Sequence, residues 1–194
     1  EGLSAIPHLP ARTMQDYSIL EKYIGSLSEE AGCKKILVVG GSNKQIGNIT
    51  SSLEILQSDL LSKFDFKQVG LAGHPEGHPH ISDNDLDEII IKKNHFSKNA
   101  DYTLYFVTQF FFESKAFKAW EKHINLLGNK LEIHAGIPGP ANLKTLISYA
   151  KSCGIGNSIK FLSQQAFNIT KIATSKKPDM LIADLAEYKF NTPS

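Results

Sequence analysis

Five short apolar runs, rich in β-branched and aromatic residues, recur along the chain about every 30 residues, which is the length of one βαβ unit. The segments between them carry apolar residues at helical spacing. Runs that are apolar on both faces and alternate with helices predict a mostly parallel, buried sheet in an α/β protein. The predicted strands are residues 3–9, 35–39, 68–72, 102–108 and 131–135.

Helices are expected between these strands, and only helices follow the last one. Leu20, Tyr23, Ile24 and Leu27 have helical spacing, as do the leucines of residues 53–61. The predicted N-caps are Thr13, Ser51 or Ser52, and Ser82. The predicted carboxy-terminal helices are residues 142–151, 157–174 and 179–188. No linker or low-complexity tract divides the chain, so a single domain over residues 1–194 is predicted.

Two architectures fit this pattern. Five strands suit an open doubly wound parallel sheet, whereas a TIM-like (β/α)8 barrel needs eight strands and about 250 residues. Strand counting by itself favours the open sheet. In both architectures ligands bind at the carboxyl ends of the strands, so the residues that follow each strand are the candidates for function.

Composition excludes several classes of function. The 21 basic and 20 acidic residues give a net charge of +1, which argues against nucleic acid or an acidic membrane as partner. Arg12 is the only arginine, so bidentate arginine clamps on phosphate are nearly excluded. Cys33 and Cys153 alone provide neither a disulfide framework nor a cysteine zinc site.

The sequence also indicates a cytoplasmic location. No apolar run approaches the roughly 20 residues of a membrane span, and no cleavable signal peptide is recognisable. The chain starts at Glu1, close to an apolar stretch, and closes on a helical pattern. We therefore expect that the sequence is a fragment, cut at both ends.

The third predicted strand is followed by the richest loop, Gly-His-Pro-Glu-Gly-His-Pro-His at residues 73–80. Its histidines, His74, His78 and His80, invite a metal-site interpretation, because neutral imidazole suits zinc or iron. Two prolines and two glycines make such a loop rigid and extended, so its side chains rarely converge on one ion. Presentation of His78 to a flat organic ligand is the better account.

The other strand ends carry weaker signals. His8 lies at the end of the first run, and the pair Gly40-Gly41 follows the second. The fourth run leads into Gln109 and three phenylalanines at 110–112, which offer an amide and stacking surface to a heteroaromatic ring, although core packing explains at least two of these rings equally well. Residues 136–140, Gly-Ile-Pro-Gly-Pro, follow the fifth run.

Taken together, these strand ends resemble the methylenetetrahydrofolate reductase family. The resemblance rests on Pro-His-Leu at 7–9, Gly-Leu-Ala-Gly-His-Pro-Glu-Gly-His-Pro at 70–79, Val-Thr-Gln-Phe-Phe-Phe at 107–112 and Gly-Ile-Pro-Gly-Pro at 136–140. It implies a TIM-like (β/α)8 barrel, of which this chain supplies the third to seventh βα units. The first two strands and the eighth would then be missing, and the first and fifth strands here would not pair with each other.

The resemblance also implies site residues. Those matching the family's FAD-binding positions are His8, Gly40, Gly41, Ser42, Thr50, His74, His78, Asp85 and Lys92. Gln109 matches the glutamine that holds the folate pterin, and Phe111 is its candidate neighbour. The family usually has an arginine and an aspartate where Gly40 and Ser42 stand. No metal ligand is implied.

The activity implied is reduction of 5,10-methylenetetrahydrofolate to 5-methyltetrahydrofolate with NAD(P)H, in one-carbon metabolism and methionine supply, by a cytoplasmic homo-oligomer. The family's proton-donating glutamate lies outside this chain, so no catalytic residue is assigned and the isolated chain is expected to be inactive. One alternative is a non-catalytic paralogue that binds flavin or folate, which the departures at Gly40 and Ser42 favour. A less favoured alternative is a metal-dependent hydrolase or aldolase using His74, His78 and His80.

Overall fold

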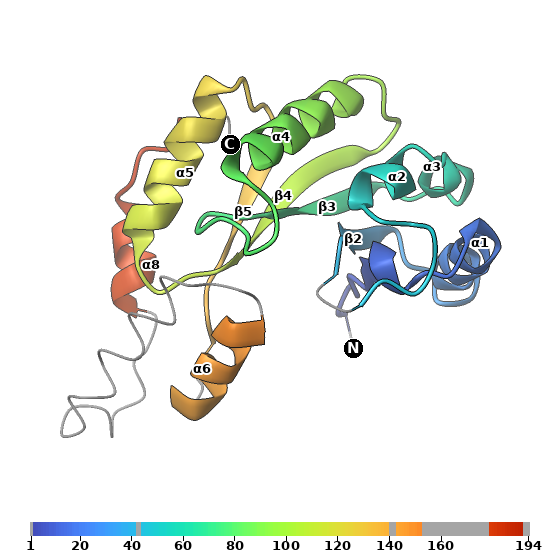
Figure 1. The fold of residues 1–194 in the computed structure, drawn as a ribbon, viewed down its shortest axis with the longest axis horizontal. Coiled ribbons are helices and arrows are strands. Elements are labelled where there is room, and N and C mark those ends of the chain that lie inside the picture. The colour runs from blue at the N-terminus through green and yellow to red at the C-terminus, as the bar shows by residue number, and fades with distance from the viewer. Residues whose placement is uncertain (1, 42–43, 140–142, 153–178, 192–194) are drawn as a thin grey trace. The chain divides into compact units, whose positions relative to one another are not determined.

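The structure is a computed structural model that describes residues 2–41, 44–139, 143–152 and 179–191. It contains one five-stranded sheet with the strands in chain order (Figure 1). The first two neighbouring pairs are parallel. The strands are β1 (His8–Pro10), β2 (Lys35–Val39), β3 (Gln68–Gly73), β4 (Thr103–Phe110) and β5 (Glu132–Gly136).

The strand order decides between the two predicted architectures. In a doubly wound sheet the order reverses at a switch point, whereas in a (β/α)8 barrel each strand lies beside the next one in sequence. The order β1-β2-β3-β4-β5 has no reversal and separates β1 from β5. The α/β prediction is confirmed, and the sheet has the order of a partial TIM-like barrel.

The first strand was predicted wrongly. Residues 3–9 were expected to form it, but β1 runs from His8 to Pro10. Leu3 is 92% exposed, and the first contact with β2 is made by the carbonyl of Pro7, which accepts a hydrogen bond of 2.9 Å from the Leu37 N–H. Among the described residues nothing covers Leu3, and pairing with β2 starts only at Pro7, so His8 opens β1 instead of following it.

The other four strands agree with prediction, with ends shifted by one or two residues. The largest difference is in β4, which continues to Phe110 and therefore includes Gln109. β3 and β5 each extend one residue further than expected, to Gly73 and Gly136.

The first helix, α1 (Tyr17–Gly25), starts later than its predicted cap. Asp16 is the N-cap, and its carboxylate accepts a hydrogen bond of 2.9 Å from the Ile19 N–H. Thr13 instead donates its hydroxyl to the Pro10 carbonyl at 2.8 Å, within the short 3-10 helix η1 (Ala11–Thr13). The wider turn η2 (Ser26–Glu30) continues α1.

The helix expected over residues 53–61 is divided into α2 (Ser52–Leu56) and α3 (Leu60–Lys63). Asp59 lies between them with φ of 57°, a left-handed conformation that ends a helix. Ser51 caps α2 by accepting a hydrogen bond from the Glu54 N–H.

The later helices match the pattern of apolar residues. Ser82 caps α4 (Asp83–Ser97), as predicted, by accepting from the Asp85 N–H at 3.2 Å. It is followed by α5 (Ser114–Leu126), α6 (Leu143–Ser152) and α8 (Asp179–Ala186). The helix predicted over residues 157–174 lies outside the described residues. None of the helices in the described ranges has both the length and the apolar character to cross a membrane.

The chain divides into two compact units. The amino-terminal unit comprises residues 1–72 and 92–107, and the carboxy-terminal unit comprises residues 73–91 and 108–194. Leu9, Val38, Leu71 and Phe106 are among the fully buried residues of the first unit. In the second unit Phe111, Phe117 and Leu185 form the core cluster. The single-domain assignment remains a prediction.

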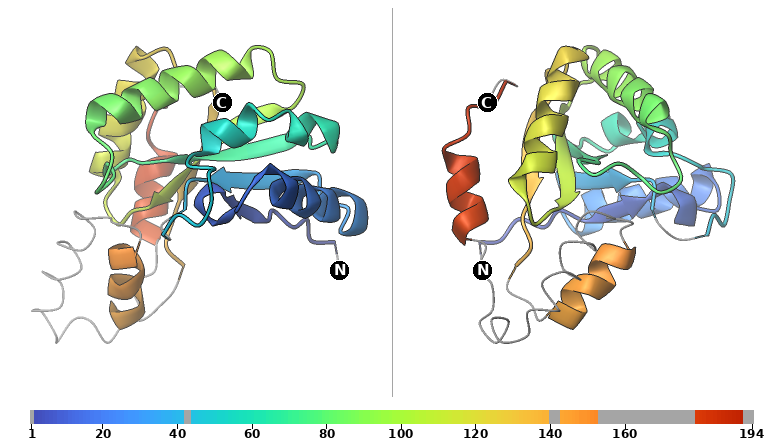
Figure 2. Two further views of the ribbon diagram at one scale, coloured as in Figure 1. Left: turned by 45° about the vertical axis from the view of Figure 1, so that its right-hand side comes forward. Right: turned by 60° about the vertical axis from the view of Figure 1, so that its left-hand side comes forward.

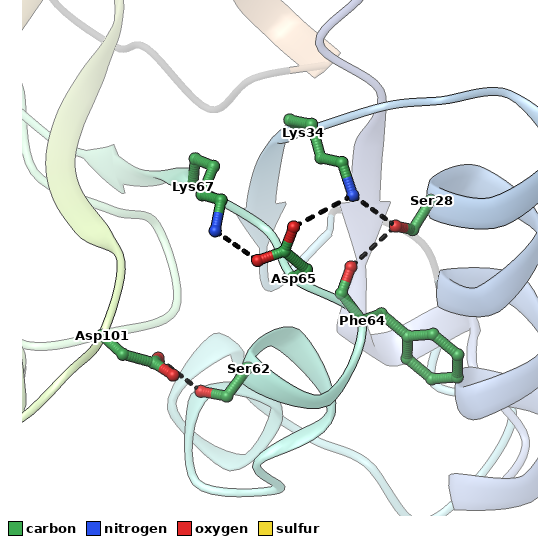
Figure 3. A network of polar contacts seen from close by, with 7 residues as sticks. All are labelled: Ser28, Lys34, Ser62, Phe64, Asp65, Lys67 and Asp101. Atoms are coloured by element: carbon green, nitrogen blue, oxygen red, sulfur yellow. Dashed lines mark hydrogen bonds and ion pairs between the residues drawn. The ribbon is translucent and has the colours of Figure 1, made fainter.

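Polar contacts fix the amino ends of β2 and β3 within the amino-terminal unit (Figure 3). The ammonium of Lys34 lies 3.3 Å from a carboxylate oxygen of Asp65 and donates to the Ser28 hydroxyl at 3.4 Å. Ser28 in turn donates to the Phe64 carbonyl at 2.6 Å, and Lys67 pairs with the other oxygen of Asp65. These contacts lie at the opposite strand ends from those where a barrel binds its ligands. Both ion pairs of Asp65 are exposed, so they add little stability.

Candidate functional site

In the amino-terminal unit, the carboxyl end of β2 is a tight backbone turn. Gly41 has φ of 89°, and a Cβ there would lie 3.1 Å from the Cβ of Pro10. A Cβ at Gly40 would meet no atom of the described residues within 4 Å, so none of them covers the backbone there. A ring could therefore approach the main chain closely at Gly40. Ser42 lies outside the described residues.

The only arginine of the chain joins this turn to Thr50. The N–H of Arg12 donates to the Gly40 carbonyl at 3.0 Å, and its Nε donates to the Thr50 carbonyl at 3.4 Å. Arg12 thus contacts two residues expected at the cofactor. Its backbone N–H holds the carbonyl of Gly40, and its side chain holds the carbonyl of Thr50. Arg12 was not among the predicted site residues, although its place two residues after β1 was a usable signal.

The Thr50 hydroxyl is engaged in capping α2. It donates to the carboxylate of Glu54, which also receives the Ser51 hydroxyl at 3.1 Å. Burial raises the pKa of Glu54, but hydrogen bonds from Thr50 and Ser51 outweigh it, so the net pKa lies below the ordinary value. Glu54 therefore stays ionised at neutral pH and orders the segment that carries Thr50.

His8 does not lie at the carboxyl end of its strand. In the parallel register His8 is opposite Leu37, and Pro10 is opposite Val39, the last residue of β2. The side chain of His8 is exposed. It therefore starts about two residues, or roughly 7 Å, before the strand end at which the barrel ligand is expected.

On α4 the structure distinguishes two adjacent lysines. Lys92, the predicted cofactor residue, is exposed, whereas Lys93 is only 3% exposed. The Lys93 ammonium donates to the Ala72 carbonyl at 3.4 Å and lies 5.5 Å from the Phe106 ring centre. Burial lowers the pKa of Lys93 from 10.5 to about 8.

Sequence reasoning missed Lys93, although a signal was present. Leu86, Ile90 and Lys93 are spaced i, i+4, i+7, so they share one face of α4. A lysine on the apolar face of an amphipathic helix is a candidate for burial and function. Its ammonium lies at the carboxyl end of β3, where the histidine loop begins.

In the carboxy-terminal unit, the histidine loop is a rigid turn. The N–H of Gly77 donates to the His74 carbonyl at 3.0 Å, and Gly77 has φ of 78°. The rings of His74 and His78 meet edge to face with centres 5.3 Å apart, and those of His78 and His80 are 6.0 Å apart. His78 is therefore the central ring of the three.

The Nδ1 atom of His78 accepts the backbone N–H of His80 at 3.2 Å. A ring nitrogen that accepts a hydrogen bond carries no proton, so in this arrangement Nε2 is the donor nitrogen of the ring. Among the described residues, no group of three or more His, Cys, Asp or Glu side chains is placed to hold a metal ion. The metal-dependent alternative gains no support from this loop.

Asp85 lies in the first turn of α4. Its carboxylate accepts the Ser82 hydroxyl at 2.6 Å, while its N–H donates to the same hydroxyl oxygen. Ser82 and Asp85 thus hydrogen-bond to each other in both directions, and Asp85 takes part in the N-cap of α4. Its side chain is exposed.

The carboxyl end of β4 separates the three phenylalanines. Phe111 is fully buried and stacks on Phe117 with ring centres 4.9 Å apart. Phe110 and Phe112 are partly exposed and meet edge to face at 5.7 Å. The ring expected to contact substrate, Phe111, is thus in the core, and its two neighbours are the ones that a ligand can reach.

Gln109 is held by a close contact between β4 and β5. A Cβ on Gly136 would lie 2.4 Å from the Thr108 carbonyl oxygen and 3.0 Å from that of Gln109. The N–H of Gly136 donates to the Thr108 hydroxyl at 2.8 Å, and the Gly136 carbonyl accepts from the Phe111 N–H at 3.3 Å. Only glycine fits here, and it fixes the backbone of Gln109, whose side-chain oxygen is buried.

The groups gathered at the end of β4 are an amide and two partly exposed rings, and three imidazoles occupy the β3 loop. Their chemistry suits a flat heteroaromatic ligand with donor and acceptor edges. The family model for methylenetetrahydrofolate reductase matches residues 1–177.

The chain belongs to the methylenetetrahydrofolate reductase family. This family has the TIM-barrel fold, in agreement with the sequential strand order. Membership supports an oxidoreductase function of the methylenetetrahydrofolate reductase type, with folate as substrate class, in one-carbon metabolism. Members of the family are commonly flavin-dependent. The match ends at residue 177, so α8 and the residues after it lie beyond it.

Proposed function

We propose that this protein binds FAD and reduces 5,10-methylenetetrahydrofolate to 5-methyltetrahydrofolate with NAD(P)H. The observation that carries the proposal is the family match over residues 1–177, which includes all five strands and the loops that follow them. The proposal includes a role in methionine supply, a cytoplasmic location and a homo-oligomeric state.

The residues present are compatible with a flavin. In the amino-terminal unit, no described atom covers the backbone at Gly40, so a ring can approach the main chain there. In the carboxy-terminal unit, the turn offers the imidazoles of His74 and His78 to a flat ring. Each feature is compatible with a flavin by itself. FAD would supply the hydride-transfer chemistry between the nicotinamide and the folate. The chain's own contribution is to bind and orient, through the Arg12 contacts that hold Gly40 and Thr50 and through the cap that orders the start of α2.

For the folate, we assign Gln109 to the pterin. Its amide offers a donor and an acceptor together, which match the amide edge of a pterin ring. Phe110 and Phe112 provide stacking surface beside it, in place of the buried Phe111. The Gly136 contact keeps the Gln109 backbone from moving, so the amide is oriented before the substrate arrives.

A second candidate is a paralogue that binds flavin or folate without turnover. It is favoured by one observation, the absence of any side chain at Gly40, where the family usually has an arginine. A visible spectrum of the purified protein, followed by anaerobic addition of NADH or NADPH and then of methylenetetrahydrofolate, distinguishes the candidates.

The proposal expects a yellow protein that NADH or NADPH bleaches and whose colour the folate restores, with 5-methyltetrahydrofolate as product. Flavin colour that neither nucleotide bleaches would identify the paralogue instead. A colourless protein that takes up no added FAD and contains zinc would rule out both.

A further inference from the structure

The carboxy-terminal residues 179–191, here called the tail, consist of α8 and the five residues that follow it. They lie beyond the family match, which ends at residue 177. Within the carboxy-terminal unit, α8 lies alongside α5 (Figures 1 and 2). The contacts between the tail and α5 show that this placement is specific.

The apolar side of the tail completes the core cluster behind the end of β4. Leu185 is 7% exposed and belongs to one cluster with Phe111 and Phe117. Leu181 packs against the same cluster, and the Phe190 ring meets Phe117 edge to face at 6.0 Å. Residues of β5 and of the tail therefore belong to the same apolar cluster as Phe111.

A buried carboxylate anchors the end of the tail. Glu121 on α5 is fully buried. It accepts the Tyr188 hydroxyl at 2.9 Å, the Asn191 N–H at 2.7 Å and the Asn191 side-chain amide at 2.8 Å. Taking a carboxylate out of water is costly unless hydrogen-bond donors replace the water, and the tail supplies these donors.

A second contact of the tail is exposed. Asp184 accepts from the Lys118 ammonium at 2.6 Å and from the Ser114 hydroxyl. The hydrogen bonds from Lys118 and then Ser114 lower the pKa of Asp184 below its ordinary value. Exposed pairs of this kind add little stability, so this contact provides a matched control for the buried one.

The anchor is connected to the folate side of the site by two steps. The tail shares one core cluster with Phe111, through Leu185 and through the Phe117 ring on which Phe111 stacks. Phe111 lies two residues after Gln109, and its N–H donates to the Gly136 carbonyl at 3.3 Å. Gly136 in turn abuts the backbone of Gln109. The contacts that hold Phe111 in the core therefore also restrict the backbone of Gln109, through Gly136.

We propose that the tail is a clasp that fixes the carboxyl end of β4 for folate binding, with Glu121 as its positioning residue. This inference rests on the proposed function, because it assigns the clasp to the folate site. It predicts that loosening the tail weakens folate binding while leaving flavin binding in place.

The test compares two variants of the full chain. The double variant Tyr188→Phe/Asn191→Ala removes two donors from Glu121 and leaves the Asn191 N–H. The control variant Asp184→Ala removes only the exposed contact. The dissociation constants of FAD and of 5-methyltetrahydrofolate are measured for each, together with hydrogen exchange of the amides at 110–112 and 188–191.

In the double variant, we expect the 5-methyltetrahydrofolate dissociation constant to rise about tenfold, as for a buried acceptor that loses its donors. The FAD constant should stay within about twofold, and exchange at both amide groups should quicken. The control variant should match wild type, as is usual for exposed pairs. Tail release with unchanged folate binding, or equal weakening of both ligands, would overturn the clasp.

The proposed function can fail separately, if wild-type protein binds neither FAD nor 5-methyltetrahydrofolate. In that case hydrogen exchange of the double variant tests the clasp by itself. Faster exchange of the amides at 188–191 without faster exchange of those at 110–112 would overturn the clasp. Should the double variant fail to fold, Tyr188→Phe alone is compared with the same control by the same measurements.

Discussion

Lys93 provides the sharpest test of the packing at the carboxyl end of β3. Its side chain is 3% exposed, and burial lowers its pKa from 10.5 to about 8. Replacement by methionine, Lys93→Met, keeps a long flexible side chain and removes the charge. At neutral pH the lysine is charged both folded and unfolded, so wild type carries the full cost of burying that charge.

The size of the cost follows from the fall in pKa, since each pKa unit is worth about 1.4 kcal/mol. The fall from 10.5 to about 8 corresponds to about 3 kcal/mol. Because the folded pKa is below the unfolded one, the cost is complete below about pH 8 and disappears as the pH rises through 10.5. Wild type should therefore gain about 3 kcal/mol relative to Lys93→Met over this range.

Urea unfolding of both proteins between about pH 7 and pH 11 measures this difference. Other groups that titrate in the range affect both proteins equally and cancel. Methionine also loses the hydrogen bond to the Ala72 carbonyl, worth about 1 kcal/mol, but that loss is a constant offset. The control is Lys92→Met, which removes the charge of the exposed neighbouring lysine on the same helix. A Lys93→Met difference that stays constant from neutral to alkaline pH would refute the argument.

Three further changes test the candidate site. His78→Ala should lower flavin retention, measured by absorbance after gel filtration, more than His80→Ala, because His78 is the central ring of its loop; equal losses would count against its role. Gln109→Ala should leave flavin bound and weaken folate binding by about 1–3 kcal/mol in a titration; unchanged affinity would remove Gln109 from the substrate site. Gly136→Ala should lower the free energy of unfolding by about 2 kcal/mol through the clash with the Thr108 carbonyl and also weaken folate binding. Gly139→Ala, where a Cβ meets no atom of the described residues within 4 Å, should do neither.

The positions of β2, β3 and β4 could be predicted from the sequence because each contains consecutive buried apolar residues. β5 was also predicted, although its residues are only partly buried or exposed. The run at 3–9 has the same composition, but composition does not say whether a partner exists to cover it. Leu3 is exposed, and pairing with β2 begins only at Pro7. The local sequence pattern also predicted the wrong N-cap for α1. Thr13 and Asp16 are both suitable cap residues, but the Thr13 hydroxyl donates to the Pro10 carbonyl in the 3-10 helix, and Asp16 caps α1.

The site residues were harder to predict, because a sequence motif does not show in which direction each side chain points. The alternation of side chains holds only within a strand, and β4 ends at Phe110. Beyond that point the sequence does not indicate which ring faces the core, and stacking on Phe117 decides it in favour of Phe111. Likewise the adjacent Lys92 and Lys93 differ in burial only because of the face of α4 that each occupies.

Gly70, the first residue of the longest matching motif, has a packing role. A Cβ there would lie 2.9 Å from Leu37 Cδ1 and 3.1 Å from the Tyr105 ring, on the neighbouring strands of the amino-terminal unit. The Leu37 side chain and the Tyr105 ring therefore occupy the space that a side chain at position 70 would need. The motif thus combines a residue required for packing the barrel, Gly70, with residues placed for a ligand in the loop that follows.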